Sequence, residues 1–521
     1  MSNRSWKKVI LGLVFLALSI FYTVLFFRNA NFGQMMTFNI AHIKSLTNIF
    51  TSPINFDYWN HSGSQINLFS PWLTLLSGWL FVQFNVSFGF SVYLTLITFL
   101  TLISAYYFMN RFHEDTFESI LFAGIYTFSM NRFMLVFSDQ RIENYLALIF
   151  LPLIYYGAYE LFADQGWKTL VWGEALIVWT APYVALAVNL TLIPIVFLVL
   201  FTHLSHSWKY WGHLSVNFLK AVGLVVLTTI GFMGPLVIVQ SQQKLQQVPV
   251  KNFDYLNWFF NLRIPRLQGY LLMAIAGLLL VLCLMIFLQS SFAYKIIILE
   301  AIPLAWLVIA QPKIQFLDIS RLIFSFQSIL DFFLILILCR IVLLIFQESP
   351  AILRLLLLLA MIGGLGYFNY YQANALNPKQ TIIAADSINY QNYVENYHDK
   401  ATNGNNRFLV NGQEEEISYN TKESDYWIQY INPKTVDIDI PIQYLDSYQV
   451  LINNESVKAI RSDRQTVRLK TNPGKNIIEI HSRYSWTNII FLLINLCGFI
   501  MLIYLNLKNI RLKNKKNPEN G

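Results

Sequence analysis

The sequence predicts a polytopic α-helical membrane protein of about 12 transmembrane helices with one extracytoplasmic, mainly β, sandwich-like domain. Three observations lead to this fold class. Of the 521 residues, 55% are hydrophobic and only 13% are charged, whereas soluble domains carry about 25% charged residues. Apolar runs of about 18 or more residues recur, which is the length that a helix needs to cross a bilayer. Between residues 370 and 485 alternating polar and apolar segments replace these runs.

The apolar runs give the predicted spans in order. The first ends in bulky residues, Phe26-Phe27-Arg28-Asn29, and is too long for a signal-peptide core, so we expect a retained helix. Pro182 interrupts the run from 168 to 204 and removes a backbone donor, so we expect two helical pieces there. The predicted spans are 7–27, 89–108, 118–137, 144–162, 168–185, 188–204, 217–240, 269–288, 293–310, 321–345, 351–369 and 486–507.

Basic residues at the two chain ends predict the topology. Arg4, Lys7 and Lys8 precede the first span, and the tail 508–521 is basic. Basic flanks stay on the cytoplasmic side, and an even number of spans agrees with both termini being cytoplasmic. The net charge of +8 lies almost entirely at these ends. We therefore expect the lipid bilayer as a partner and no nucleic acid.

The first long loop, 28–88, is expected on the outer face. Its segment 68–84 is apolar and about 17 residues long, at the lower limit for a span. Counting it as a span would put the basic ends on opposite sides, so we predict an interfacial or re-entrant helix. Pro71, Trp72 and Trp79 suit an interface. With this choice the loop shares its face with the turn 139–143, and residues 1–369 form one multi-span domain.

The segment 370–485 is predicted to be the extracytoplasmic β domain, joined through the last span, 486–507, to the cytoplasmic tail. Its second half alternates in the segments 435–440, 448–452, 466–470 and 476–480. Turn signals separate them at Ile431-Asn432-Pro433, Asn453-Asn454 and Pro473-Gly474-Lys475. We expect antiparallel strands in a small sandwich.

Three acids of the outer loops, Asp57, Asp139 and Glu143, are the candidate catalytic residues. A carboxylate there could act as base for an acceptor hydroxyl or hold a divalent cation against a lipid phosphate. Arg141 and Lys44 are candidates for binding the phosphate. The alternative is that these residues are ordinary solvated loop charges. A divalent cation is thus a candidate cofactor, although no metal-ligand spacing accompanies His42.

Acids also occur inside predicted spans. Glu300 and Asp331 lie deep, and Gln327 is four residues before Asp331 on one helical face. Ionisable groups within a membrane are costly and suggest function by default. A polar cavity or proton path is one interpretation, and hydrogen bonding between helices is the other.

Several stretches together resemble the bacterial multi-span proteins of the YfhO type, also described as 6-pyruvoyl-tetrahydropterin-synthase-related membrane proteins, within the GT-C superfamily of glycosyltransferases. The stretch Phe38-Asn39-Ile40-Ala41-His42-Ile43 is similar to the family frame after the first span. The stretches that carry the rest of the resemblance are Phe69-Ser70-Pro71-Trp72-Leu73, Tyr126 with Ser129 and Arg132, Arg141 with 146–153, Gln315-Phe316 with Arg321, 448–453 and 474–478.

The resemblance implies a protein of the bacterial cytoplasmic membrane with a GT-C-like core that transfers a sugar from a polyprenyl-phosphate carrier. It places the family acid at Met35, the family histidine at Asn39 and the family glutamate near Asn144, and none of these keeps a titratable group. Asn39, His42, Lys44 and Arg141 form the expected substrate-binding set, with no metal ligands.

The predicted function is a cell-envelope glycosyltransferase that moves a sugar from a polyprenyl-phosphate carrier to an envelope polymer or lipid at the outer leaflet. Two alternatives stay open. One is a non-catalytic GT-C-like relative that binds a lipid-linked or polymer ligand or scaffolds envelope assembly, which the empty family positions favour. The other is a transporter or flippase that uses Glu300 and Asp331.

Overall fold

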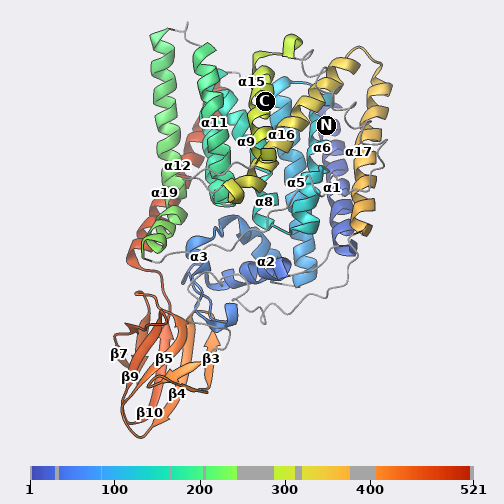
Figure 1. The fold of residues 1–521 in the computed structure, drawn as a ribbon. Coiled ribbons are helices and arrows are strands. Elements are labelled where there is room, and N and C mark those ends of the chain that lie inside the picture. The colour runs from blue at the N-terminus through green and yellow to red at the C-terminus, as the bar shows by residue number, and fades with distance from the viewer. Residues whose placement is uncertain are drawn as a thin grey trace. The chain divides into compact units, whose positions relative to one another are not determined.

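The computed structural model describes residues 3–29, 34–83, 85–163, 166–202, 207–242, 287–310, 319–375 and 407–516 (Figure 1). Contacts divide the chain into two units. The helical unit comprises residues 1–31, 94–225 and 250–378, and the loop–sandwich unit comprises residues 32–93, 226–249 and 379–521. The first loop is therefore grouped with the β domain, whereas the sequence suggested one continuous membrane domain over 1–369.

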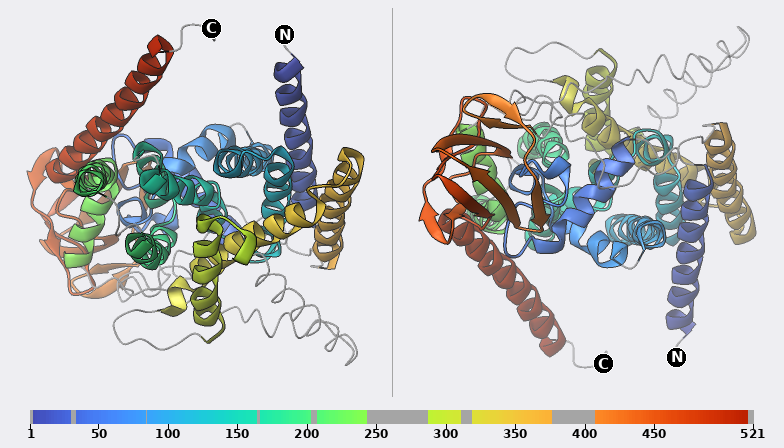
Figure 2. Two further views of the ribbon diagram at one scale, coloured as in Figure 1. Left: turned by 90° about the horizontal axis from the view of Figure 1, so that it is seen from above. Right: turned by 90° about the horizontal axis from the view of Figure 1, so that it is seen from below.

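Ten helical segments of the described residues are long and apolar enough to cross a membrane, which is compatible with an integral membrane protein. Several are seen end-on in Figure 2. The longest continuous helices are α1 (Asn3–Asn29), α5 (Val86–His113), α11 (Pro182–Thr202), α12 (Trp208–Gln242), α15 (Phe292–Ala310), α16 (Ile319–Phe346), α17 (Ala351–Ala375) and α19 (Trp486–Lys516). Two further segments are composite and are described next.

Both composite segments contain breaks. Thr116–Ser138 consists of α6 (Thr116–Thr127), α7 (Met130–Phe133) and a π-helical turn (Met134–Ser138), and Ile142–Ala163 consists of α8 (Ile142–Ala147) and α9 (Leu151–Ala163). Asp115 caps α6, because its carboxylate accepts a hydrogen bond from the Glu118 amide at 2.8 Å. The segment Thr116–Ser138 is a central element of the helical unit, because 89% of the residues in its most apolar stretch are buried.

The predicted spans agree with these helices with two exceptions. The span at 269–288 lies outside the described residues except for its last two positions. The span at 168–185 is wrong, because α10 (Lys168–Val178) ends after 11 residues and α11 begins at Pro182. The predicted break at Pro182 is confirmed, and proline suits the first helical position because no amide donor is needed there. The topology prediction rested on an even number of spans and stays a prediction.

Among the described residues of the apolar segment 68–84, no helix is long enough to span. It holds the end of α3 (Ile66–Phe69), a 3₁₀ turn (Leu73–Leu75) and α4 (Leu76–Val82). The run Leu73–Val82 rises about 15 Å at 1.5 Å per residue, against a hydrocarbon core of about 30 Å. The first part of the loop contains α2 (Gln34–Ser45) and 3₁₀ turns at Leu46–Asn48 and Trp59–His61.

The C-terminal β domain is confirmed as two antiparallel five-stranded sheets. Sheet I has the order β2-β1-β5-β9-β8, and sheet II has the order β3-β4-β10-β6-β7. Their inward side chains form one shared core, as in a sandwich. The strands are β1 (Phe408–Val410), β2 (Gln413–Glu415), β3 (Tyr419–Lys422), β4 (Asp425–Asn432), β5 (Val436–Gln443), β6 (Gln449–Ile452), β7 (Glu455–Val457), β8 (Ile460–Arg461), β9 (Thr466–Thr471) and β10 (Gly474–His481).

The predicted domain boundary at 370 is shifted, because α17 continues to Ala375. The predicted strands 435–440, 448–452, 466–470 and 476–480 correspond to β5, β6, β9 and β10. Asn453 and Asn454 both have positive φ, of 52° and 70°, as the tight turn between β6 and β7 requires.

The first loop completes the sandwich core. Ile54 and Phe56 are fully buried among the inward residues of both sheets. The Phe56 amide donates a hydrogen bond to the Glu423 carbonyl at 2.6 Å, and the Gln443 amide donates to the Ser62 carbonyl at 2.8 Å. The loop therefore contributes two core side chains and two backbone bonds to the β domain.

Candidate functional site

Asp57, one of the predicted catalytic acids, contacts the β domain. Its Oδ1 accepts a hydrogen bond from the Thr421 hydroxyl at 2.9 Å, and its Oδ2 accepts one from the Glu423 amide at 2.8 Å. Both carboxylate oxygens are therefore engaged beside the point where Phe56 enters the core. This geometry gives Asp57 a role in fastening the loop to the end of β3.

The predicted binding residues of α2 are held within the loop. His42 is buried, and its Nε2 lies 3.1 Å from Oδ1 of Asn67. Burial lowers the pKa of His42 to about 4, so the ring is neutral at neutral pH. Asn39 is also buried, and the Lys44 ammonium lies 5.7 Å from the centre of the Tyr58 ring. These contacts order the loop.

Asp139, Arg141 and Glu143 lie together in the helical unit, at the turn between the π-helical segment and α8. The π-helical segment ends where the Asp139 amide bonds the Met134 carbonyl, and the Arg141 amide then bonds the Leu135 carbonyl. Burial raises the pKa of the Asp139 carboxyl, and the nearby Arg141 opposes this shift. Burial lowers the pKa of Arg141, and the negative charges of Asp139 and Glu143 oppose this shift. The turn thus combines one guanidinium with two carboxylates, all three half-buried.

Helix α16 places several features of the helical unit along one axis. The Arg141 guanidinium lies 4.2 Å from the centre of the Phe324 ring. One to two turns further along α16, Ser328 accepts a hydrogen bond from Asn131 at 3.1 Å, and Asp331 is hydrogen-bonded to Ser129. Gln327, on the same helix, is half-buried.

The motif Tyr126, Ser129 and Arg132 lies at the break between α6 and α7. Arg132 is fully buried and donates hydrogen bonds to the Thr127 carbonyl at 3.1 Å and the Thr98 hydroxyl at 2.9 Å. Its guanidinium also lies 4.5 Å from the centre of the Tyr22 ring. The Arg132 side chain therefore supplies a hydrogen-bond donor to a backbone carbonyl at the helix break. Backbone groups inside an apolar bundle need such partners.

A partly open cavity of about 300 Å³ lies in the helical unit, close to the lower limit for ligand pockets. Its lining is mainly apolar and rich in aromatic rings contributed by α5, α6, α9, α15 and α16. Phe332, Phe333 and Leu336 belong to α16, so the cavity begins about 12 Å along that helix from Phe324. Other lining residues include Phe108, Phe112, Phe122, Tyr156, Tyr159 and Phe292.

Two buried acids lie beside this cavity. Tyr155 lines it, and its hydroxyl is 2.6 Å from the Thr191 hydroxyl. Glu174 and Glu300, from α10 and α15, are both within electrostatic reach of Tyr155. Asn189 donates a hydrogen bond to Glu174 at 3.1 Å. Glu300, which the sequence grouped with Asp331 by depth, thus lies within electrostatic reach of Tyr155.

A second polar cluster borders the cavity and was missed as a cluster by the sequence. Glu118 is fully buried; it accepts a hydrogen bond from the Tyr294 hydroxyl at 2.7 Å and lies 2.7 Å from Nδ1 of His113. Arg340 lies 4.0 Å from Glu118 and donates to Nε2 of His113 at 2.9 Å. Phe112 joins the cluster to the cavity, because it lines the cavity and its ring contacts that of Tyr294. Only the short spacing of His113 and Glu118 was visible in the sequence.

Among the residues that the structure describes, no group of three or more His, Cys, Asp or Glu side chains is arranged to hold a metal ion. In comparisons with known proteins, no protein-family model matches the sequence, and no curated protein matches it. The candidate site is therefore defined by geometry alone: the charged turn Asp139–Glu143, helix α16 and the aromatic cavity.

Proposed function

We propose that the protein is an integral membrane glycosyltransferase that takes a sugar from a polyprenyl-phosphate carrier at the outer leaflet. The aromatic cavity of about 300 Å³ is the observation that carries this proposal. Its apolar lining suits a hydrocarbon chain and offers few polar partners to a soluble substrate. Helix α16 connects the cavity to the turn that holds Arg141 and two of the predicted catalytic acids, Asp139 and Glu143, because it lines the cavity and also contacts Arg141.

The carrier's phosphate would contact Arg141. A guanidinium presents paired donors to phosphate oxygens, and stacking on Phe324 fixes its plane. About 12 Å along α16 separate Phe324 from the first cavity residue, Phe332. A lipid whose chain occupies the cavity would therefore extend along α16 to bring its phosphate to the turn.

Asp139 is the proposed base for the acceptor hydroxyl. Burial raises the pKa of its carboxyl, which brings it closer to the operating pH and makes the carboxylate a stronger base. Asp57 is less suited, since both of its oxygens accept hydrogen bonds from the β domain. The proposal therefore selects Asp139 from the three predicted acids and leaves Glu143 as a second charge beside Arg141.

Complementation of a deletion strain tests the proposal. The envelope glycan of the deletion strain should lack a sugar substituent that the wild-type gene restores. Asp139→Asn should fail to restore it at an equal protein level, and Glu143→Gln should restore it at least in part. Full restoration by Asp139→Asn would refute catalysis by this acid and favour a non-catalytic binder.

The acids near Tyr155 favour a second candidate, a transporter. Glu174 and Glu300 come from two helices towards one cavity-lining hydroxyl, and one oxygen of each carboxylate has no hydrogen-bond partner among the described residues. Buried acids of this kind occur in proton-coupled transporters. Reconstituted protein would then carry a proton-coupled current that Glu300→Gln abolishes, whereas a glycosyltransferase would show no such current.

A further inference from the structure

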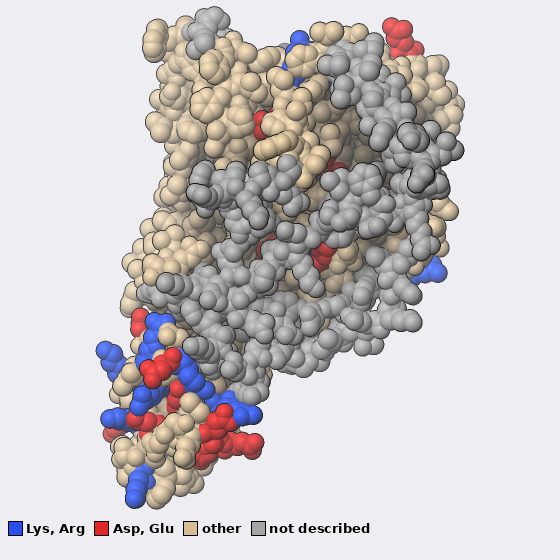
Figure 3. Space-filling model, in the orientation of Figure 1, with Lys and Arg blue, Asp and Glu red and all other residues tan. Residues whose placement is uncertain are grey.

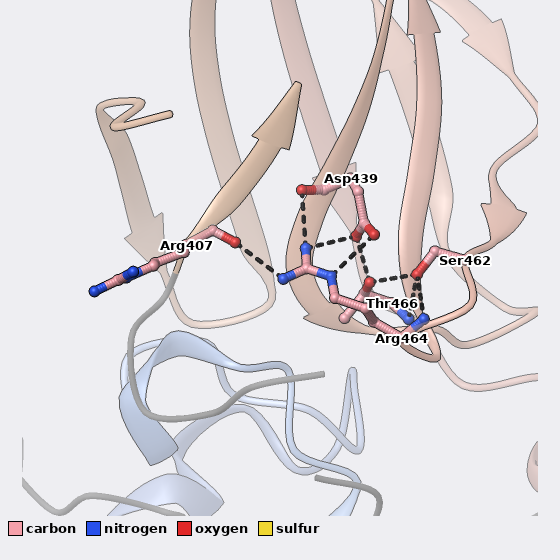
Figure 4. Close-up of polar contacts among 5 residues, drawn as sticks. All are labelled: Arg407, Asp439, Ser462, Arg464 and Thr466. Atoms are coloured by element: carbon pink, nitrogen blue, oxygen red, sulfur yellow. Dashed lines mark hydrogen bonds and ion pairs between the residues drawn. The ribbon is translucent and has the colours of Figure 1, made fainter. Parts of the chain in front are cut away.

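The two outward faces of the β sandwich differ in chemistry. Sheet I carries opposite charges on neighbouring strands, and Figure 4 shows one of these groups around Arg464. Arg464 bonds Asp439 through two nitrogens, at 3.0 and 2.9 Å, and Arg468 bonds Asp437 at 2.6 Å. These four charges therefore satisfy one another within the domain.

Sheet II instead presents apolar side chains outward. Tyr426 and Ile428 are buried in the core, so Trp427 between them points to the opposite face. By the same alternation Ile431 and Ile477 face outward, and they are 68% and 41% exposed. The surface of the domain is otherwise rich in Lys, Arg, Asp and Glu, as the face visible in Figure 3 shows.

The register between β4 and β10 places Trp427, Ile477 and Ile431 in one strip on the outer face of sheet II. Trp427 pairs with Glu479, Gln429 with Ile477, and Ile431 with Lys475. Trp427, Ile477 and Ile431 therefore alternate between β4 and β10 along the strand direction. Diagonal neighbours of this kind are within reach of one another, so the strip is continuous and narrow, with the outward-facing Leu451 of β6 beside Ile477.

Hydrogen-bonding groups flank Trp427 on both sides. Asn420 of β3 and Glu479 of β10 are its direct neighbours across the sheet. Neighbouring strands are about 4.8 Å apart, so each polar group stands about one strand away from the indole. The Nε2 of His481 lies 3.4 Å from Glu479, and its Nδ1 lies 2.6 Å from Asp425, which holds these polar groups in place.

We propose that the outer face of sheet II, along Trp427, Ile477 and Ile431, binds a polysaccharide chain. A pyranose ring has an apolar C–H face, which an aromatic ring can cover, and hydroxyls at its edge, which amides and carboxylates can bind. A narrow strip fits a linear polymer, whereas a protein partner would need a broad apolar core. The inference rests on the proposed function only in taking this polymer to be the acceptor.

The charge of the face argues against an anionic membrane surface as the occupant. Lys422 and Lys475 are balanced by Asp425 and Glu479 on the same three strands, β3, β4 and β10. Binding to anionic lipids requires a cluster of basic residues. A polymer recognised through sugar rings requires no such excess.

Cosedimentation of the detergent-solubilised full-length protein with purified cell-wall sacculi tests the inference. Wild-type protein should sediment with the sacculi, and soluble glycan fragments should release it. Trp427→Ala should weaken binding about tenfold or more, because a central Trp carries a large share of the energy of an interface. Ile460→Ala is the matched control, since it removes an apolar side chain that is 57% exposed on sheet I.

Each outcome of this experiment decides the inference. Failure of the wild-type protein to bind, or unchanged binding by Trp427→Ala, overturns it. Binding to anionic phospholipid vesicles that Trp427→Ala abolishes, without binding to sacculi, overturns it in favour of a membrane surface. Asp139→Asn should sediment as the wild type does. A loss of sugar transfer with retained binding would therefore bear on the proposed reaction at Asp139. A loss of binding would bear on the proposed polysaccharide site of sheet II.

Discussion

The helical unit and the β domain differ in how deeply their paired charged side chains are buried. In the helical unit, Glu118 is fully buried and contacts three polar side chains of other elements. In the β domain, Arg468 and Asp437 pair at 2.6 Å with side chains that are 46% and 27% exposed. The chemical groups are similar, and their surroundings differ.

This difference teaches that the same ion pair has different energetic weight in the two regions. An exposed pair exchanges water for a partner and gains about 0–1 kcal/mol. A buried pair has lost its hydration, so removing one partner leaves an uncompensated charge and costs about 3–5 kcal/mol. The polar networks of the helical unit should therefore determine whether it folds, whereas those of sheet I should be nearly dispensable.

The largest effect is expected from Glu118→Ala, which should destabilise the protein by about 3–5 kcal/mol, because Arg340 would remain buried without its carboxylate. Thermal unfolding in detergent measures this. Glu118→Gln should cost less, since it keeps an acceptor for the Tyr294 hydroxyl. The double variant Glu118→Leu with Arg340→Met should recover much of the loss. If Glu118→Ala unfolds at the wild-type temperature, the contrast between the regions is wrong.

An intermediate effect is expected from the pH dependence of His42. Its pKa is about 4 in the folded protein and about 6.5 in an unfolded chain. The unfolded state therefore binds the proton more readily, and stability should fall as pH drops from about 6.5 to about 4, by up to about 3 kcal/mol.

Unfolding midpoints measured across this pH range test the effect. His42→Gln should remove this part of the acid loss, because the substituted amide does not titrate. Lys44→Gln, on the same helix, serves as the control and should keep it. Identical pH profiles for His42→Gln and the wild type would contradict a buried, neutral histidine.

The smallest effects are expected on sheet I. Arg468→Ala should leave the unfolding midpoint unchanged, because its pair with Asp437 is solvated. Arg464→Ala should cost about 1 kcal/mol, since Arg464 makes two bonds to the Asp439 carboxylate, one to the Asp439 carbonyl and one to the Arg407 carbonyl. A loss for Arg468→Ala as large as that for Glu118→Ala would remove the distinction between the two regions.

The first loop shows where sequence reasoning stops. Its length and its apolar segment 68–84 were visible, and hydropathy with the charge of the chain ends predicted that the segment does not span. The insertion of Ile54 and Phe56 into a sandwich core more than 350 residues later in the chain was not visible. Neither residue differs in type from the apolar residues around it, so only the packing identifies them.

The candidate site shows the same limit. Asp57 and Asp139 are equivalent by type and predicted face, and their contacts distinguish them, because Asp57 binds Thr421 and Glu423. The sequence grouped Glu300 with Asp331 by depth alone, and the structure places Glu300 within electrostatic reach of Tyr155 on α9.

The sequence by itself determined the classes of structure, because length, hydropathy and alternation act locally. Apolar runs specify helices of spanning length, Pro182 specifies a break, and alternation specifies the strands of the sandwich. Only the tertiary structure decided which residues meet: Phe56 in the sandwich core, Glu118 with Arg340, and the aromatic rings around the cavity. These contacts join residues far apart in the chain, and their energy depends on shape and burial, which no local pattern records.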